Sequence, residues 1–253
     1  MSLPRIRLEL CSRLDGEGRW RLDEFQARHL MKALRCYEGA MVEGLLGEGK
    51  GERILARVER SGEFFLLRTV DVKAEERDPL EITLLIGLLK HSQFESVLRA
   101  SAELGVKSVR PVLCERSVPR PGARETEGKM SRWRKILDEG TKVSGSVFAP
   151  DLADPVNFRD VGWDALPSAR YAALLSPAAV PLANVDARAA GELVFAVGPE
   201  GDWTDSESSV LLGSGFVPVS LGRRILRAST AAMAGCAWFR LSAEHELQRC
   251  HNT

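Results

Sequence analysis

The stretch that most constrains the fold covers residues 192–227, where two apolar runs each end in a glycine-bearing loop. The first run, residues 193–197, is followed by the loop GPEG at 198–201. The second, residues 216–221, continues into the loop GRRILR at 222–227. The first run is uninterrupted, which is typical of a parallel strand that is buried on both faces, and the second run, which includes Ser220, predicts a further strand. Because ligands of α/β proteins bind at the carboxyl ends of such strands, the two loops predict a shared ligand site.

The segment between the two loops predicts a helix. Thr204 and Glu207 have the spacing of a capping box, in which each side chain accepts a hydrogen bond from the backbone of the other residue. Residues 210–212 are apolar, and Gly213 or Gly215 would end the helix. The order strand, loop, helix, strand, loop is that of one part of an α/β sheet.

The remainder of the chain predicts two domains. In residues 1–77, short runs of alternating apolar and polar residues predict β-strands. One helix is expected over 23–35, with Leu34 on its apolar side. Short strands with a single helix predict a small β-barrel over these residues. Within them the glycine-rich stretch 47–51 lacks the GK[ST] ending of a phosphate-binding loop and predicts a hairpin tip. A charged stretch before Pro79 marks the boundary. The residues that follow alternate apolar strands with helical segments and predict an α/β domain; these segments are 82–89, 92–105, 109–113, 129–144, 171–175 and 229–241.

Composition excludes several classes of protein. The chain has 35 Lys plus Arg and 35 Asp plus Glu, so any nucleic acid would have to bind a local basic cluster. Its five cysteines include no CxxC pair, and its four histidines lack zinc spacing, which predicts reduced thiols and no metal site; Cys250 and His251 fit a frayed tail. No apolar run has the length of a membrane span and no signal sequence is evident, so we expect a cytoplasmic protein.

The two loops have specific chemical properties. Glycine at 198 and 201 allows close approach of the backbone to a ligand, such as an adenine or a methionyl group, although a tight turn without a ligand explains the pattern as well. The second loop places three arginines beside apolar side chains, and guanidinium groups bind phosphate or carboxylate in a forked geometry. A basic loop before a helix is the alternative there. No arrangement typical of a hydrolase or of a metal enzyme stands out.

Several motifs in this order carry a resemblance to a known family. VGPEG at 197–201 and VSLGRRILR at 219–227 follow SAELGVKSVRPVLCERSV at 101–118. HLMKALR at 29–35, followed by Gly39, resembles the family stretch HLxxVLR. Together these motifs resemble the RsmE family of the SPOUT superfamily, and the similarity covers nearly the whole chain. Lys90, Trp133 and Ile136 also match positions of the family pattern.

The resemblance implies a fold and an activity. It implies an α/β, SPOUT-type parallel sheet with a trefoil knot and helices on both faces over residues 78–253, preceded by a PUA-like small β-barrel over 1–77 that binds RNA. It implies an enzyme that uses S-adenosyl-L-methionine (SAM) to methylate N3 of a uridine in 16S rRNA of the small ribosomal subunit. It also implies a homodimer with RNA bound across the interface.

The resemblance also implies roles for individual residues. Arg227, the last residue of the second loop, would stabilise the anionic base that forms when the uridine loses its N3 proton. The cofactor would be enclosed by Leu174, Leu175, Ser176, Val197, Gly198, Pro199, Glu200, Gly201, Leu221, Gly222, Arg224, Ile225 and Leu226. RNA would be bound by Arg5, Arg7, Lys32, Arg35, Lys90 and Arg116, together with the basic residues around Arg120, Arg124 and 129–135.

Some residues depart from the family pattern. Asp202 stands where the family has the second glycine of GPEGG, and Ser229 stands where it has a glutamate. Lys142, Val143 and Ser146 replace a Glu-Gln pair and an arginine. The loop glycines are therefore retained, whereas polar groups on the expected substrate side are not. Two alternatives stay open: methylation of another rRNA or tRNA nucleotide, and a non-catalytic RNA-binding or ribosome-assembly factor.

Overall fold

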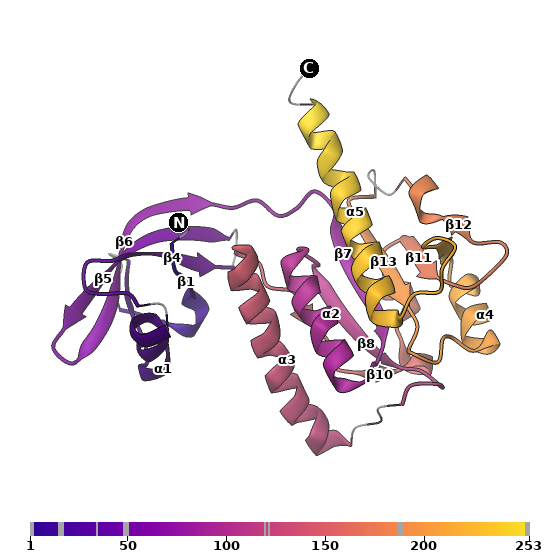
Figure 1. Cartoon of the computed structure of the whole chain (residues 1–253), viewed down its shortest axis with the longest axis horizontal. Coiled ribbons are helices and arrows are strands. Elements are labelled where there is room, and N and C mark those ends of the chain that lie inside the picture. Colours follow the sequence, from indigo (N-terminus) through magenta and orange to yellow (C-terminus); the bar gives the residue numbers. More distant parts are fainter. Residues whose placement is uncertain are drawn as a thin grey trace. The chain divides into compact units, whose positions relative to one another are not determined.

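The structure is a computed structural model that describes residues 3–14, 18–33, 35–47, 51–118, 120, 122–186 and 190–250 (Figure 1). The chain divides into two compact units, Met1–Arg77 with Thr141–Ala149, and Asp78–Gly140 with Pro150–Thr253. Leu34, residues 48–50 of the expected hairpin tip, the side chain of Arg124, the side chain of Cys250 and all of His251 lie outside the described part.

The first unit is built on a six-stranded mixed sheet with the order β1-β4-β5-β6-β3-β2. β1 pairs with β4 in parallel, and the other neighbours are antiparallel. The strands are β1 (Arg5–Arg7), β2 (Ser12–Arg13), β3 (Arg19–Arg21), β4 (Met41–Leu46), β5 (Glu52–Ser61) and β6 (Phe64–Ala74).

Connectivity forces this sheet to curl. Its two edge strands, β1 and β2, are joined by a short link that contains the 3₁₀ turn η1 (Leu8–Leu10). A flat sheet of six strands would separate its edges by roughly 24 Å, whereas the link from residue 7 to residue 12 spans at most roughly 18 Å. The curled sheet encloses a core that includes Leu8, Trp20, Leu30, Val42, Val58 and Leu67, as the barrel prediction requires.

The single helix expected over residues 23–35 is divided into two parts. α1 (Glu24–Arg28) starts at a capping box made by Asp23 and Gln26, and a π-helical turn, η2 (His29–Ala33), follows it. Arg35 has a φ of 54°, a left-handed conformation that no helix can continue through. The helix was therefore predicted at the correct position, but it is a short α-helix followed by a π-helical turn and not one regular helix.

Residues 141–149 complete the first unit, although the predicted boundary places them in the second domain. The guanidinium groups of Arg5, Arg7 and Arg53 donate hydrogen bonds of 2.7–3.1 Å to backbone carbonyls of residues 142–147. The carbonyls at the end of a helix have no partner within that helix, so side-chain donors stabilise them. These long-range hydrogen bonds explain why a segment distant in sequence packs against β1 and β5.

The second unit is built on a parallel sheet with the order β10-β8-β7-β13-β11-β14-β12, and β9 also pairs with β8. The strands are β7 (Glu81–Gly87), β8 (Ser108–Leu113), β9 (Asp151–Leu152), β10 (Val156–Asn157), β11 (Ala169–Ala173), β12 (Val180–Pro181), β13 (Glu192–Val197) and β14 (Val217–Ser220). The helices are α2 (His91–Glu103), α3 (Ala123–Ser144), α4 (Asp205–Gly213) and α5 (Ala228–Cys250), with short 3₁₀ turns η3 (Phe158–Asp160), η4 (Trp163–Ala165) and η5 (Leu182–Asn184).

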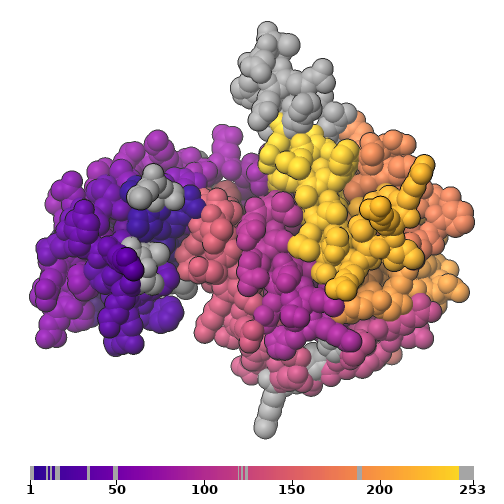
Figure 2. Space-filling model, in the orientation of Figure 1, coloured from indigo at the N-terminus to yellow at the C-terminus, as the bar shows by residue number. Residues whose placement is uncertain are grey.

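The sequence 193–197 of strand β13 is apolar because both of its faces are buried. Leu193, Phe195 and Val197 face the core that includes α2 and α5, whereas Val194 and Ala196 face the core that includes α4. The sheet therefore carries helices on both faces, as predicted. α2 and α5 lie side by side over one face (Figures 1 and 2). Gly235 permits the close approach of α5, because a Cβ atom there would lie 2.2 Å from the ring of Phe195.

The last strand in sequence does not lie at the edge of the sheet. β14 is inserted between β11 and β12, both of which precede it in the chain. The predicted trefoil knot requires a return of this kind, and the knot itself stays a prediction.

The described cysteines are free thiols. Burial raises the pKa of Cys11, Cys114 and Cys236 to about 12, so these thiols are protonated at neutral pH and are poor nucleophiles. Within the described ranges no group of three or more His, Cys, Asp or Glu is placed to hold a metal ion. Among the same residues, no helix has the length and apolar character needed to span a membrane.

Candidate functional site

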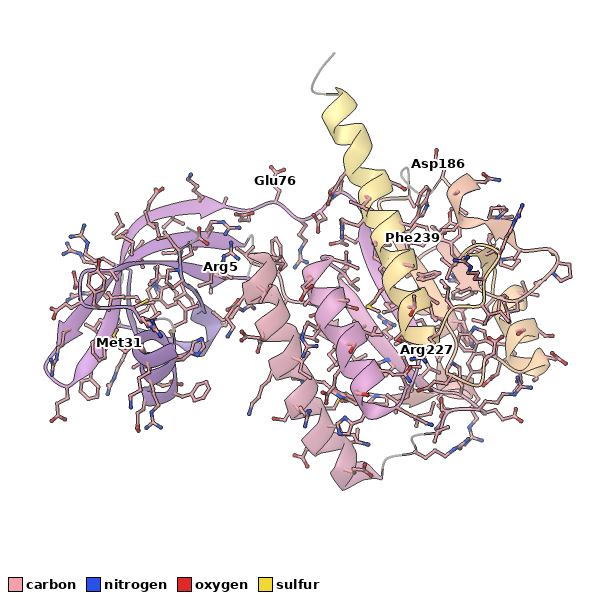
Figure 3. The ribbon with its side chains drawn as sticks, viewed as in Figure 1. Arg5, Met31, Glu76, Asp186, Arg227 and Phe239 are labelled. Carbon is pink, nitrogen blue, oxygen red and sulfur yellow. The ribbon has the colours of Figure 1, made fainter. Side chains whose placement is uncertain are left out.

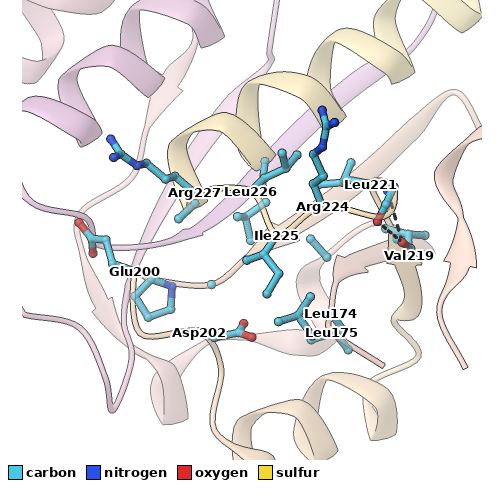
Figure 4. A pocket seen from close by; sticks show the side chains of 18 of the residues that line it. Leu174, Leu175, Glu200, Asp202, Val219, Leu221, Arg224, Ile225, Leu226 and Arg227 are labelled. Atoms are coloured by element: carbon cyan, nitrogen blue, oxygen red, sulfur yellow. Dashed lines mark hydrogen bonds between the residues drawn. The ribbon is translucent and has the colours of Figure 1, made fainter. Parts of the chain in front are cut away.

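A cavity of about 350 Å³ lies at the carboxyl ends of β11, β13 and β14 (Figure 4). Its volume falls within the range of roughly 300–1,000 Å³ that is typical of small-molecule sites. Each of the three strands is followed by a segment that contributes to the lining, and α2 adds Gln93. The cavity therefore occupies the position at which parallel α/β sheets bind their ligands.

Eleven of the thirteen residues predicted to enclose a cofactor lie in this lining. Ser176 and Gly201 do not: the Ser176 hydroxyl accepts from the backbone N–H of Ala178, and Gly201 packs against Arg116. Leu174, Leu221 and Leu226 form apolar walls. Ile225 and Leu175 are 81% and 71% exposed, so two large apolar side chains remain uncovered beside the cavity. Lining residues that the prediction missed are Gln93, Ala173, Asp202, Val219, Ser220, Ala228 and Ala231.

The turn after β13 is held by close backbone packing. A Cβ atom on Gly87, at the end of β7, would lie 2.4 Å from the backbone nitrogen of Pro199. One on Gly198 would lie 3.2 Å from three atoms of Trp203. The turn can therefore rest on the end of β7 because residue 87 is glycine, and it packs closely against Trp203 because residue 198 is glycine. Sequence reasoning overlooked Gly87, although a glycine inside an apolar strand marks a close backbone approach.

Hydrogen bonds anchor the same turn from outside the cavity. The backbone N–H of Lys90 donates to Oε1 of Glu200 at 2.8 Å. The guanidinium group of Arg116 donates to the carbonyl oxygens of Gly201, at 3.1 Å, and Trp203, at 3.3 Å. Lys90 thus contributes to the site through its backbone, and Arg116 fixes the turn.

Asp202 keeps the conformation that favours glycine at its position. Its φ is 60°, and its Oδ1 accepts from the backbone N–H of Trp203 at 2.8 Å. Aspartate visits the left-handed region more readily than most residues because such a local hydrogen bond stabilises it. Residue 202 therefore keeps a turn conformation that glycine would also allow, and it places a carboxylate in the cavity lining.

Similarity to known proteins shows the family of this chain. Residues 76–240 match a family model described as an RNA methyltransferase domain. A Synechocystis protein named ribosomal RNA small subunit methyltransferase E is 36% identical over 220 residues, which are 84% of this chain and 69% of that protein. The chain belongs to the RsmE family of RNA methyltransferases.

Further relatives support the family and the fold. A Borreliella burgdorferi protein named ribosomal RNA small subunit methyltransferase E 2 is 29% identical over 85% of this chain and 88% of its own length. A crystal structure of ribosomal RNA small subunit methyltransferase E from Neisseria gonorrhoeae, bound to S-adenosyl methionine, is 28% identical and has a TM-score of 0.82. That comparison covers 94% of this chain and 97% of the other, so the likeness extends over both units, and the parallel sheet of the second unit is the SPOUT-type part.

Glu207 connects two loops of the RsmE fold. It is buried, and its carboxylate accepts from the backbone N–H groups of Thr204, at 2.9 Å, and Glu115, at 2.8 Å. The backbone N–H of Glu207 in turn donates to the hydroxyl of Thr204, so the predicted capping box is confirmed. Glu207 therefore joins the start of α4 to the loop that follows β8.

We expect Glu207→Ala to lower the free energy of unfolding by about 2–4 kcal/mol, because one buried and one partly buried N–H group lose a charged acceptor. Urea denaturation of the full chain measures the loss. Asp205→Ala is the matched control, since Asp205 is an exposed carboxylate in the first turn of α4, and it should cost about 1 kcal/mol or less. Equal losses in the two variants would contradict the structural role of Glu207.

Arg227 lines the cavity, and its side chain makes no ion pair or hydrogen bond with a described residue. It precedes α5 and is exposed, and its backbone carbonyl accepts from the N–H of Ala231 at 2.8 Å (Figure 3). The structure shows no ion pair or hydrogen bond of its guanidinium group with any described residue. That group is therefore available to a ligand.

The residues expected to bind RNA separate into two groups. Arg7 is buried, donates to the carbonyl of Val147 and pairs with Glu9, and Arg5 pairs with Glu43 at 3.0 Å. These two arginines therefore stabilise the first unit, whereas the sequence predicted that they bind RNA. Lys32 and Arg35 are exposed. Lys32 lines a hollow of about 790 Å³ that also includes Arg21 and Phe64, whose ring lies 3.7 Å from the Arg21 guanidinium carbon.

Proposed function

We propose that this chain transfers a methyl group from SAM to N3 of a uridine in the RNA of the small ribosomal subunit. The observation that carries the proposal is the cavity at the ends of β11, β13 and β14, enclosed by two glycine-bearing loops. Eleven of the thirteen residues that the family resemblance assigns to the cofactor line this cavity, which supports the proposal. Relatives named ribosomal RNA small subunit methyltransferase E support the substrate class.

The residues present fit SAM. The cavity has the volume of a small-molecule site, and Leu174, Leu221 and Leu226 offer apolar surface for an adenine ring. The absence of side chains at Gly198 and Gly222 leaves backbone groups accessible for polar recognition. When bound, SAM supplies an electrophilic methyl group on a positively charged sulfur.

The residues of this chain have two tasks in the reaction. The uridine must lose its N3 proton as the methyl group is transferred, so negative charge develops on the base. The guanidinium group of Arg227, beside the cavity, would stabilise that charge. The walls of the cavity and the RNA-binding surface would hold the base and the methyl donor in line, which contributes much of the rate.

RNA binding is proposed for surfaces on both units. On residues 1–77, as a PUA-like domain, the exposed Lys32 and Arg35 would contact phosphates. On residues 78–253, as the methyltransferase domain, the basic residues of the segment 116–135 would do the same. The target base would leave its stack or lie in a single-stranded region. The homodimer that the family resemblance implies is part of the same proposal, as is the cytoplasmic location.

The two kinds of basic residue in the first unit can be distinguished. We expect Arg7→Ala to lower the free energy of unfolding by about 3 kcal/mol, because it leaves the carbonyl of Val147 without its donor and the partly buried carboxylate of Glu9 without its ion-pair partner. Lys32→Ala should leave stability within about 0.5 kcal/mol and weaken RNA binding, with a salt dependence reduced by about one phosphate contact. Urea denaturation and RNA titrations at several salt concentrations measure both. If Arg7→Ala weakened RNA binding without a change in stability, Arg7 would be an RNA-binding residue and not a structural one.

Methyl transfer from labelled SAM to unmodified small ribosomal subunits tests the function, with mass-spectrometric mapping of the product nucleotide. A single N3-methyluridine is the expected result. A methyl label on another nucleotide would show that the enzyme has a different substrate specificity. Failure to bind SAM together with retained RNA binding would favour a non-catalytic RNA-binding factor.

A further inference from the structure

We propose that the carboxylate of Asp202 makes the cavity prefer the cationic methyl donor over its uncharged product. The inference rests on the proposed function and deepens it, because it concerns which form of the cofactor the site retains. Asp202 occupies a position where the family has glycine, so the preference would be a property of this chain rather than of the RsmE fold.

The carboxylate is directed into the cavity by its backbone. Asp202 lines the cavity, and its left-handed φ of 60° follows from the turn after β13. Its Oδ1 accepts from the backbone N–H of Trp203, a residue that is itself buried in the core, which limits the rotation of the side chain. Figure 4 shows the carboxylate pointing toward Leu174, another residue of the cavity lining.

The other charged groups of the lining are turned elsewhere. The carboxylate of Glu200 extends away from the cavity and accepts from the backbone N–H of Lys90 (Figure 4). The guanidinium groups of Arg224 and Arg227 also extend outward in the same view. Within the described lining, Asp202 is therefore the charged group that points inward, and the structure shows no cation paired with it there.

The two forms of the cofactor differ by one unit of charge. SAM carries a sulfonium, an ammonium and a carboxylate group, which gives a net charge of about +1 at neutral pH, whereas its product, S-adenosylhomocysteine, has a neutral thioether and no net charge. A cavity of 350 Å³ is roughly 9 Å across if spherical, about one Debye length at 0.1 M salt. The carboxylate therefore lies close enough to attract the additional positive charge of SAM, and the cavity holds the donor more tightly than the product.

Asp202→Asn isolates the charge. Asparagine adopts the left-handed conformation as readily as aspartate, and its amide oxygen can still accept from the N–H of Trp203. The experiment is calorimetric titration of the full chain with SAM, with S-adenosylhomocysteine, and with sinefungin, an analogue that carries a protonated amine in place of the sulfonium. Each titration is made at 0.05 M and 0.5 M salt.

We expect the affinity of the variant for SAM and for sinefungin to fall about three- to tenfold at low salt, in the range of one partly exposed charge interaction. The affinity for S-adenosylhomocysteine should change less than twofold. The difference should shrink at high salt because mobile ions screen the carboxylate. Asp205→Asn is the matched control: this exposed carboxylate lies three residues away and outside the lining, and the ratio of affinities should stay that of the wild type.

The other outcomes each have one meaning. Equal weakening of all three ligands by Asp202→Asn would show that Asp202 shapes the turn or contacts a group common to them, and the preference for the donor would be rejected. Unchanged affinities would reject it as well. A wild-type chain that binds none of the three ligands would instead reject the proposed function, so the two failures are distinguishable.

Discussion

Replacing Arg227 by alanine is expected to lower kcat about 10²–10³-fold while the affinity for SAM stays within twofold. The guanidinium group lies beside the cavity and is paired with no described residue, so its charge is available to the base rather than to the protein. Loss of one preformed donor to a developing anion costs about this much in enzymes that use such stabilisation. Single-turnover methylation assays and calorimetric titration measure the two quantities separately.

Two further variants make the role of Arg227 specific. Arg223→Ala removes a neighbouring exposed arginine that does not line the cavity, and its kcat should stay within about twofold of the wild type. Arg227→Lys should restore part of the rate, because a positive charge returns without the forked geometry. The rate of Arg227→Ala should also rise more steeply with pH than that of the wild type, since high pH ionises the uridine without help. If Arg227→Ala turned over at the wild-type rate, Arg227 would not stabilise the anionic base.

Replacing Gly87 by alanine should weaken SAM binding about ten- to hundredfold. The new Cβ atom would lie 2.4 Å from the nitrogen of Pro199, and the contact is with backbone, so the turn after β13 must move. Overpacking of this kind costs about 1–3 kcal/mol, and we expect most of it in the bound state, which needs the turn in place. Calorimetric titration with SAM measures the loss. Gly198→Val should act in the same direction, because Trp203 already lies 3.2 Å from the position of a Cβ atom.

Gly213→Ala is the control for this experiment. Gly213 ends α4, and a Cβ atom there would meet nothing within 4 Å. Its affinity for SAM should equal that of the wild type, and its stability should be equal or slightly higher, since alanine favours the helix. If Gly87→Ala also bound SAM as the wild type does, the contact between β7 and the turn would be irrelevant to the site.

Local sequence predicted a large part of the site. An apolar run with no polar interruption predicted a strand buried on both faces, and β13 divides its side chains between two cores. The spacing of Thr204 and Glu207 predicted the capping box that starts α4. Both features depend on neighbours in sequence, so a pattern of a few residues is enough to specify them. The family motifs then predicted most residues of the cavity lining.

Other properties were decided by contacts between distant residues. Arg5 and Arg7 look like RNA-binding residues in sequence, yet they stabilise carbonyls more than a hundred residues away. The same hydrogen bonds bring the segment 141–149 into the first unit. Sequence alone did not predict these pairs, because the partners of a charged side chain depend on which segments the fold brings together.

The sequence by itself determined the α/β pattern of residues 78–253, the strands that carry the two glycine loops, and the capped helix between them. The tertiary structure decided the insertion of β14 between β11 and β12, the contact of Gly87 with Pro199, and the inward direction of the Asp202 carboxylate. Periodicity records which side of a strand or helix is buried. The neighbour that buries it is chosen by packing over the whole unit, which no local pattern contains.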